Sequence, residues 1–200
     1  HCHVLPGLDD GARLLEESLE MARTAVKNNI DTIVATPHSL NGFFVNRWEE
    51  VVSLTSTVQK ALDAEDIGVT LYPAMEAQVC PELFDALEKG KAATINDNSS
   101  YMLLEFPPFS MPPDSGDFIF KLKLQGITPV RAHPERNMIL QNDLKQLYDL
   151  VKQGALCQLT ALSVTGLLGP SVQKSAEQMI KTGLAHVIAT DAHSNDERIP

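Results

Sequence analysis

The chain begins with the segment HCHVLPGLDDG, residues 1–11, which contains histidine and aspartate side chains of the kind that bind transition metals. On an extended strand His1 and His3 point to the same face, because side chains alternate with a period of two. The Pro-Gly turn that follows brings Asp9 and Asp10 back toward the two imidazoles. Neutral imidazole and carboxylate together form a ligand set for Zn, Mn or Fe. An expression-tag remnant or a pair of solvated histidines is the alternative, but a tag is an uninterrupted run of histidines.

Further candidate ligands lie where predicted strands end, and six of the seven predicted strands carry such residues. Those outside the first segment are His38, Glu76, Glu105, His133, Asp191 and His193. With His1, His3 and Asp10 they make nine candidates, which are too many for one ion. They suit two or three ions, with a carboxylate bridging a pair about 3.5–4 Å apart.

Amphipathic helices alternate with apolar, β-branched strands along the whole chain, which indicates an α/β fold. Strands are expected at His1 and at 30–36, 69–77, 101–106, 127–132, 155–160 and 184–190. Helices are expected at 12–27, 48–64, 81–88, 116–125, 144–153 and 171–182. Seven strands fit a closed β/α barrel better than an open sheet, and barrels of this kind carry their chemistry at the C-terminal ends of the strands. We therefore predict a single domain over residues 1–200.

Composition excludes several other classes of protein. The formal net charge is −10 and no cluster of Lys and Arg is present, which argues against a nucleic-acid binder. No apolar run approaches the ~18–20 residues of a membrane span. Cys2, Cys80 and Cys157 are widely spaced and odd in number, which favours a reducing cytoplasm over a disulfide framework.

Arginines flank the predicted site and offer a way to hold an anion. A guanidinium matches phosphate oxygens bidentately, so Arg131, Arg136 and Arg198 are candidate phosphate ligands, with surface salt bridges as the alternative. His186 lies within an apolar strand and is interpreted as a core or helix-facing histidine. Four loop phenylalanines either wall a pocket for an aromatic group or cover the barrel rim: Phe43, Phe44, Phe106 and Phe109.

The order of the motifs resembles a known family. HCHVLPGLDDGA, ATPH, the Glu of AMEAQV, the Glu of LLEFP, RAHPER and TDAH are similar to the PHP (polymerase and histidinol phosphatase) superfamily. The closer match is its CpsB/CapC/YwqE-type branch, the manganese-dependent protein-tyrosine phosphatases of bacterial capsule and exopolysaccharide systems. The resemblance covers essentially the whole chain.

This resemblance implies a distorted seven-stranded β/α (TIM-like) barrel, the PHP fold, with a trinuclear metal site. One implied metal is held by His1, His3, Glu76 and Asp191. A second shares Glu76 and takes Glu105 and His133. A third takes Asp10, His38 and His193. Arg136 and Arg198 match the arginines with which family members bind phosphate.

The resemblance also implies cofactors, a partner and a place in the cell. The cofactors are two or three divalent ions, Mn first and Fe, Zn or Mg as alternatives. The substrate is a phosphotyrosine protein, namely the tyrosine-rich tail of a bacterial tyrosine kinase of polysaccharide export, and the enzyme is cytoplasmic. A homo-oligomer is left open. The chain starts at the first ligand and ends just after Arg198, so we expect native residues to be missing at both ends.

Two other functions stay open at this point. One is a small-molecule phosphatase of the same superfamily, acting on histidinol phosphate or a nucleotide. The other is a non-catalytic interaction module that keeps the barrel without turnover, against which the full ligand set speaks.

Overall fold

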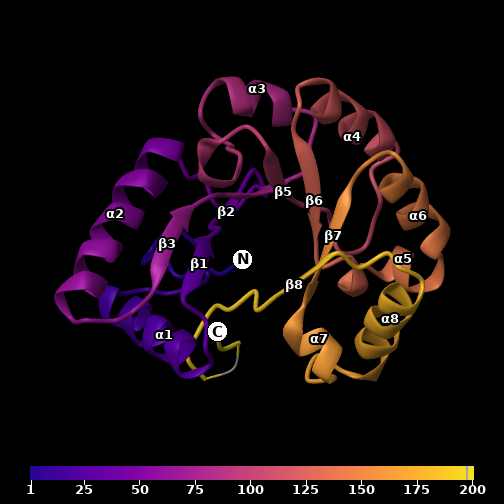
Figure 1. Cartoon of the computed structure of the whole chain (residues 1–200). Helices are drawn as coiled ribbons and strands as arrows, with labels where there is room; N and C mark the ends of the chain where they lie inside the picture. Colours follow the sequence, from indigo (N-terminus) through magenta and orange to yellow (C-terminus); the bar gives the residue numbers. More distant parts are fainter. Residues whose placement is uncertain (197) are drawn as a thin grey trace. The chain divides into compact units, whose positions relative to one another are not determined.

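The computed structural model describes residues 1–196 and 198–200 and shows an α/β chain (Figure 1). Its contacts divide it into two compact units. The first unit comprises His1–Asn98 and Thr190–Pro200, and the second unit comprises Ser99–Ala189. Along the described residues every helix is too short or too polar to cross a membrane.

The first unit alternates helices with short parallel strands. Its elements are α1 (Leu15–Lys27), β1 (Thr32–Ala35), β2 (His38–Ser39), α2 (Trp48–Ala64), β3 (Thr70–Pro73), β4 (Glu76–Gln78), α3 (Leu83–Glu88) and a 3₁₀ turn (Ile95–Asp97). Strand β1 pairs with β3, and β2 pairs with β4, both in parallel. The second pairing sets His38 directly opposite Glu76.

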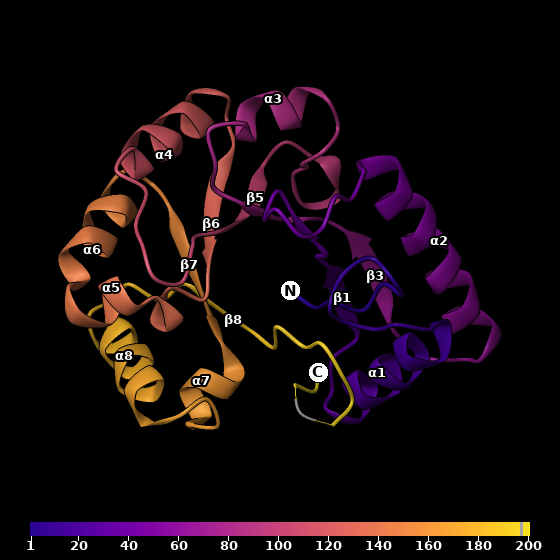
Figure 2. The same ribbon diagram turned by 180° about the vertical axis from the view of Figure 1, so that it is seen from behind.

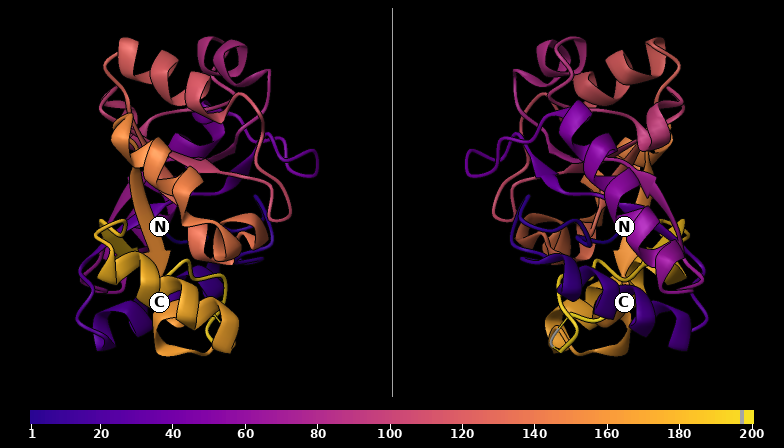
Figure 3. Two further views of the ribbon diagram at one scale, coloured as in Figure 1. Left: turned by 90° about the vertical axis from the view of Figure 1, so that its right-hand side faces the viewer. Right: turned by 90° about the vertical axis from the view of Figure 1, so that its left-hand side faces the viewer.

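Helical spacing of apolar residues explains how this unit forms its core. Val51, Val58 and Leu62 of α2 recur at intervals of seven and four residues and are buried. They share a core with Leu19 of α1 and Leu71 of β3. Helices α1 and α2 lie along the outer side of β1 and β3 in Figure 1, and the views from behind (Figure 2) and from the side (Figure 3) agree.

The second unit is a parallel four-stranded arrangement in the order β5-β6-β7-β8. Its elements are β5 (Tyr101–Glu105), α4 (Ser115–Leu124), β6 (Thr128–Ala132), a 3₁₀ turn (Pro134–Arg136), α5 (Met138–Asn142), α6 (Leu144–Lys152), β7 (Leu156–Thr160), α7 (Ala161–Thr165), α8 (Pro170–Lys181) and β8 (Val187–Ala189). Cys157 and Leu159 of β7 pack against Leu147 of α6 and Met179 of α8.

The α/β fold and its alternation of helices and strands are confirmed, with two corrections to the expected strands. The strand expected at His1 is not regular, because Cys2 forms only isolated parallel bridges, to Ala35 and Ala192. The strand expected over 69–77 divides into β3 and β4, where Pro37 and Pro73 have no N–H to donate to a ladder.

The short helices α5 and α7, with the two-residue β2, are elements that the sequence analysis did not predict. Closure of the strands into a seven-stranded barrel and the single-domain organisation stay predictions.

Candidate metal centre

Four side chains of the first unit converge on one point. The His1 Nε2 atom lies 3.2 Å from His3 Nε2, 3.4 Å from Glu76 Oε2 and 3.1 Å from Asp191 Oδ1. The His3 Nε2 atom lies 3.4 Å from the same Glu76 oxygen and 3.4 Å from the same Asp191 oxygen. Two nitrogens and two oxygens therefore face a common centre, from segments at both ends of the chain and from β4.

These spacings fit a bound metal ion. Ligands at bond lengths of about 2.0–2.2 Å stand about 3.3–3.6 Å apart in a tetrahedron and about 2.8–3.1 Å apart at adjacent corners of an octahedron. The observed separations of 3.1–3.4 Å span these two ranges. The residues thus fit a divalent cation that binds imidazole nitrogens and carboxylate oxygens.

A second group adjoins the first within the same unit. Asp10 Oδ1 lies 3.5 Å from His38 Nε2 and 3.5 Å from His193 Nε2. The other ring nitrogen of His38, Nδ1, lies 3.1 Å from Glu76 Oε2, so this imidazole connects the two groups. His3 also belongs to this second group by distance. The structure thereby gathers the three residues that the resemblance assigned to one metal.

The local chain explains why these residues meet. Gly11 packs so tightly on His3 that a Cβ atom at Gly11 would lie 2.1 Å from the His3 carbonyl oxygen. At the far end of the chain Asp191 follows β8 with a φ of 53°, a left-handed conformation that is uncommon for a non-glycine residue. Its backbone N–H donates to the His1 carbonyl at 3.1 Å. A glycine and a strained turn therefore position two of the donor groups.

Asp9 supports the cluster from behind, a role that the sequence analysis missed. Its Oδ2 atom lies 2.6 Å from His3 Nδ1 and also accepts a hydrogen bond from the His38 backbone N–H at 3.0 Å. Its Oδ1 atom accepts from the Gly11 N–H at 2.9 Å. A proton held on Nδ1 leaves the His3 Nε2 lone pair directed at the cluster, as in carboxylate–histidine–metal triads. The doubled Asp in DDG was the available signal.

His193 is oriented in a comparable way. Its Nδ1 lies 2.9 Å from the Asp191 carbonyl oxygen and donates to it, so Nε2 faces Asp10. Asn46 fixes the neighbouring loop, since its side-chain amide donates to the His38 carbonyl at 2.8 Å and to the Leu8 carbonyl at 3.1 Å.

The electrostatics of the cluster favour a positive charge. Burial alone would lower the pKa of His1, but the Glu76 and Asp191 carboxylates outweigh it and raise the pKa to about 9. Burial would likewise lower the pKa of His3, which hydrogen bonds to Asp191, Asp9 and Glu76 raise well above its usual value. In the metal-free protein the carboxylates stabilise the protonated imidazoles. A bound metal cation would take the place of those protons.

The remaining two predicted ligands lie in the second unit. Glu105 is the last residue of β5, and His133 follows β6 with a φ of 32°. Their side chains approach to 3.9 Å, between His133 Nε2 and Glu105 Oε1. They form a carboxylate–imidazole pair at adjacent strand ends.

The three arginines have different surroundings. Arg198 Nη2 donates to Asp191 Oδ2 at 2.5 Å, so it contacts a candidate metal ligand directly. Arg136 is partly buried in the 3₁₀ turn that follows His133. Arg131 is buried at 2% exposure, and its guanidinium lies 4.0 Å above the Phe106 ring, so this side chain packs inside the second unit.

His186 and the loop phenylalanines differ in how far they are exposed. His186 is exposed, and its Nδ1 accepts from the Cys157 backbone N–H at 3.1 Å, so of the two interpretations, core or helix-facing, the core one is wrong. Phe106 is buried, whereas Phe43 and Phe109 are 88% and 73% exposed.

A pocket of about 350 Å³ opens beside Asp10 and His193, with Arg13 and Ser194 in its lining. The second group therefore faces an open space on the first unit.

Comparison with known proteins gives a consistent result. The family model for capsular polysaccharide synthesis, CpsB/CapC, matches residues 1–200. The tyrosine-protein phosphatase YwqE of Bacillus subtilis (strain 168) is 38% identical over 97% of this chain and 76% of its own length. The tyrosine-protein phosphatase CpsB of Streptococcus pneumoniae is 30% identical over 100% of this chain and 84% of its own.

A solved structure is similar over the whole chain. It comes from crystallographic work on YwqE from Bacillus subtilis and CpsB from Streptococcus pneumoniae, described as metal-dependent tyrosine phosphatases. The TM-score is 0.95 at 37% identity, covering 100% of this chain and 80% of the solved one.

Proposed function

We propose that this chain, which belongs to the CpsB/CapC family of capsular polysaccharide synthesis, is a metal-dependent protein-tyrosine phosphatase. The observation that carries the proposal is the convergence of four donor atoms at 3.1–3.4 Å in the first unit. The named activity of YwqE and CpsB supports the phosphotyrosine ester as substrate. The proposal has nine metal ligands: His1, His3, Asp10, His38, Glu76, Glu105, His133, Asp191 and His193.

The chain's own residues have three tasks in this reaction. His1, His3, Glu76 and Asp191 hold one metal ion, and Asp10, His38 and His193 hold another. Divalent ions bound there supply Lewis-acid stabilisation of charge on the phosphoryl oxygens and lower the pKa of a water molecule. Asp9 keeps the His3 proton on Nδ1, and Arg198 keeps the Asp191 carboxylate turned toward the cluster. Phenolates leave readily, so this site has little need of a strong general acid.

Arg136 and Arg198 are both proposed to bind the phosphate of the substrate, on the strength of the resemblance and of their guanidinium chemistry. Arg136→Ala should raise KM or lower kcat while the metal content stays the same. Metal content is measured by elemental analysis beside the kinetics, with the exposed Arg47→Ala as the matched control. An unchanged kcat/KM in Arg136→Ala would remove this residue from the phosphate site.

The finer proposals concern the metal and the substrate. We propose manganese as the working ion, the tyrosine-rich tail of a polysaccharide-export kinase as the substrate, and the cytoplasm as the location.

Glu105 and His133 are proposed as further metal ligands. A Glu105→Gln variant should then bind fewer metal ions per chain than the wild type, while Glu50→Gln on the exposed face of α2 binds the same number.

The deciding experiment is activity on a phosphotyrosine peptide after chelation and return of Mn, Fe, Zn or Mg singly. Activity restored by one metal and lost in Glu76→Gln, but kept in Glu50→Gln, would establish the proposed function. A higher kcat/KM for histidinol phosphate or a nucleotide would assign the site to a small-molecule phosphatase. Metal-loaded protein without turnover on any of these substrates would overturn the proposal.

A further inference from the structure

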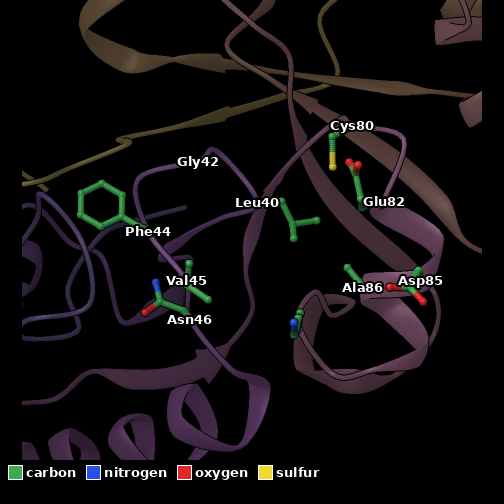
Figure 4. Close-up of a pocket in the computed structure, with 10 residues that line it drawn as sticks. Leu40, Gly42, Phe44, Val45, Asn46, Cys80, Glu82, Asp85 and Ala86 are labelled. Atoms are coloured by element: carbon green, nitrogen blue, oxygen red, sulfur yellow. The ribbon is translucent and has the colours of Figure 1, made fainter.

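A groove lies in the first unit beside the metal cluster, and the proposed chemistry does not use it. It has a volume of about 360 Å³, which falls in the range of ligand pockets. One wall is the loop of residues 40–46, hereafter the 40–46 loop, and the other is the segment from Cys80 to Ala86. Figure 4 shows Leu40 and Val45 on the loop side, and Cys80, Glu82 and Ala86 on the other.

The 40–46 loop has a defined local structure. The side chain of Asn41 accepts hydrogen bonds from the backbone N–H groups of Phe43 and Phe44, both at 3.0 Å. Asn46 ties the end of the loop to the carbonyls of Leu8 and His38. The loop, purple in Figure 3, projects from the first unit. A side chain that enters the groove would therefore meet an ordered wall.

Phe44 joins the groove to the metal cluster. It lines the groove, and its ring is stacked on the imidazole of His38, with centroids 6.0 Å apart and planes at 9°. A tyrosyl ring whose phosphate reaches the cluster near His38 would lie close to Phe44, and aromatic pairs at such separations attract each other. The residues that flank that tyrosine are then at the entrance of the groove.

The lining indicates what kind of residue the groove takes. Its walls are largely apolar, and the loop exposes Phe43 at 88% and Val45 at 78%, so covering them would bury apolar surface. The other wall carries the carboxylates of Glu82 and Asp85 and the ammonium of Lys91, and Asp85 is paired with Lys89 at 2.7 Å. Charges of both signs therefore border the groove, and its apolar walls are what favour an apolar side chain there.

We propose that this groove binds the polypeptide beside the phosphotyrosine and selects substrates with a large apolar residue there. The proposal rests on the proposed function and deepens it, because it separates recognition of the peptide from hydrolysis of the phosphate. A small aryl phosphate reaches the metal cluster without entering the groove. Blocking the groove should therefore affect peptides and leave small substrates alone.

Cys80 supplies the means of blocking it. The thiol lines the groove and is partly exposed, whereas Cys2 and Cys157 are buried at 2% and 0% exposure. Alkylation by N-ethylmaleimide places a bulky group inside the groove. Cys80→Ser is the matched control, because it offers no thiol there, and treatment with the reagent should not change its kinetics. A Cys80→Trp variant fills the same space without a reagent.

The substrates are p-nitrophenyl phosphate and phosphotyrosine peptides of Gly and Ser, in which one Leu is moved through the positions beside the tyrosine. With untreated protein, one Leu position should raise kcat/KM about tenfold over Ser at the same position, the order expected for burying one apolar side chain. Alkylation should abolish that preference and leave kcat/KM for p-nitrophenyl phosphate within about twofold. The dephosphorylated Leu peptide should slow the alkylation of Cys80.

The outcomes separate the two proposals. A protein that hydrolyses p-nitrophenyl phosphate but shows no preference among the peptides overturns the groove proposal and leaves the phosphatase intact. Equal loss of both activities on alkylation also overturns it, since the effect would then be on the cluster. A metal-loaded protein that hydrolyses none of these substrates overturns the proposed function, and the groove proposal with it.

Discussion

Replacing Asp9 by Asn tests the claim that this carboxylate sets the proton of His3. The two side chains have the same shape, so the variant changes hydrogen bonding and not packing. In the wild type, Asp9 Oδ2 faces both His3 Nδ1 at 2.6 Å and the His38 backbone N–H at 3.0 Å. An amide NH₂ in that place is a donor facing a donor, whereas an amide oxygen there would turn the NH₂ toward the Gly11 N–H.

Either orientation of the Asn amide weakens the hold on His3. In the variant, the neutral form of His3 that binds a metal would favour its one proton on Nε2, which is the nitrogen that faces Glu76 and Asp191 at 3.4 Å. That proton must be displaced before a metal binds. Loss of such a supporting carboxylate costs 10–100-fold in metal affinity, which is about 1.4–2.7 kcal/mol.

Manganese titration of the metal-free protein by calorimetry measures this cost, with Asp31→Asn at an exposed position as the control. Activity of Asp9→Asn should return at high manganese concentration, because the ligands themselves are intact. Urea unfolding of the metal-free proteins reports any loss of fold separately. An affinity within twofold of the wild type, in a variant that unfolds like the wild type, would refute the reasoning.

Three further predictions follow from the same contacts. Gly11→Ala places a Cβ atom 2.1 Å from the His3 carbonyl oxygen and should lower the free energy of unfolding by about 1–3 kcal/mol, measured in urea, whereas Gly68→Ala has open space and should not. Arg198→Ala removes the donor to a ligand carboxylate and should weaken manganese binding about tenfold by calorimetry; unchanged affinity with a raised KM would instead assign Arg198 to phosphate alone. The pKa of His1 is raised to about 9 in the metal-free protein, so its proton competes with metal below that pH. The pKa of His3 is raised as well, so manganese affinity should fall at least tenfold per pH unit from pH 8 to pH 7, and a flat profile would contradict this.

Motif order and strand ends predicted much of this site because both depend on local rules. Seven of the nine candidate ligands lie in the first unit, where the structure gathers them into two groups: His1, His3, Asp10, His38, Glu76, Asp191 and His193. A residue at the C-terminal end of a parallel strand lies at one edge of the sheet, as Glu105 does at the end of β5. Periodicity placed His38 and Glu76 at the ends of predicted strands, whereas in the structure they begin the short strands β2 and β4.

What the sequence could not show depends on contacts between distant segments. The roles of Asp9 and Asn46 require knowing which atoms their side chains reach, and neither follows from spacing. His186 lies in an apolar run, yet its ring is exposed and accepts from the Cys157 N–H. The short helix α7 follows β7 where no periodic signal of useful length exists, since five residues are less than two helical turns.

The segment His1–His3 shows why a strand prediction can be wrong in assignment and right in its consequence. Its backbone bonds to both sides: the His3 N–H donates to Ala192 at 2.8 Å, and the Thr36 N–H donates to the Cys2 carbonyl at 3.0 Å. The segment is too short for a regular ladder, but these bonds hold it extended. Extension is what turns both imidazoles to one face while Cys2 points into the core. The metal centre therefore depends on the backbone partners of three residues, and a bulky replacement at Cys2 would misplace both histidines without touching either.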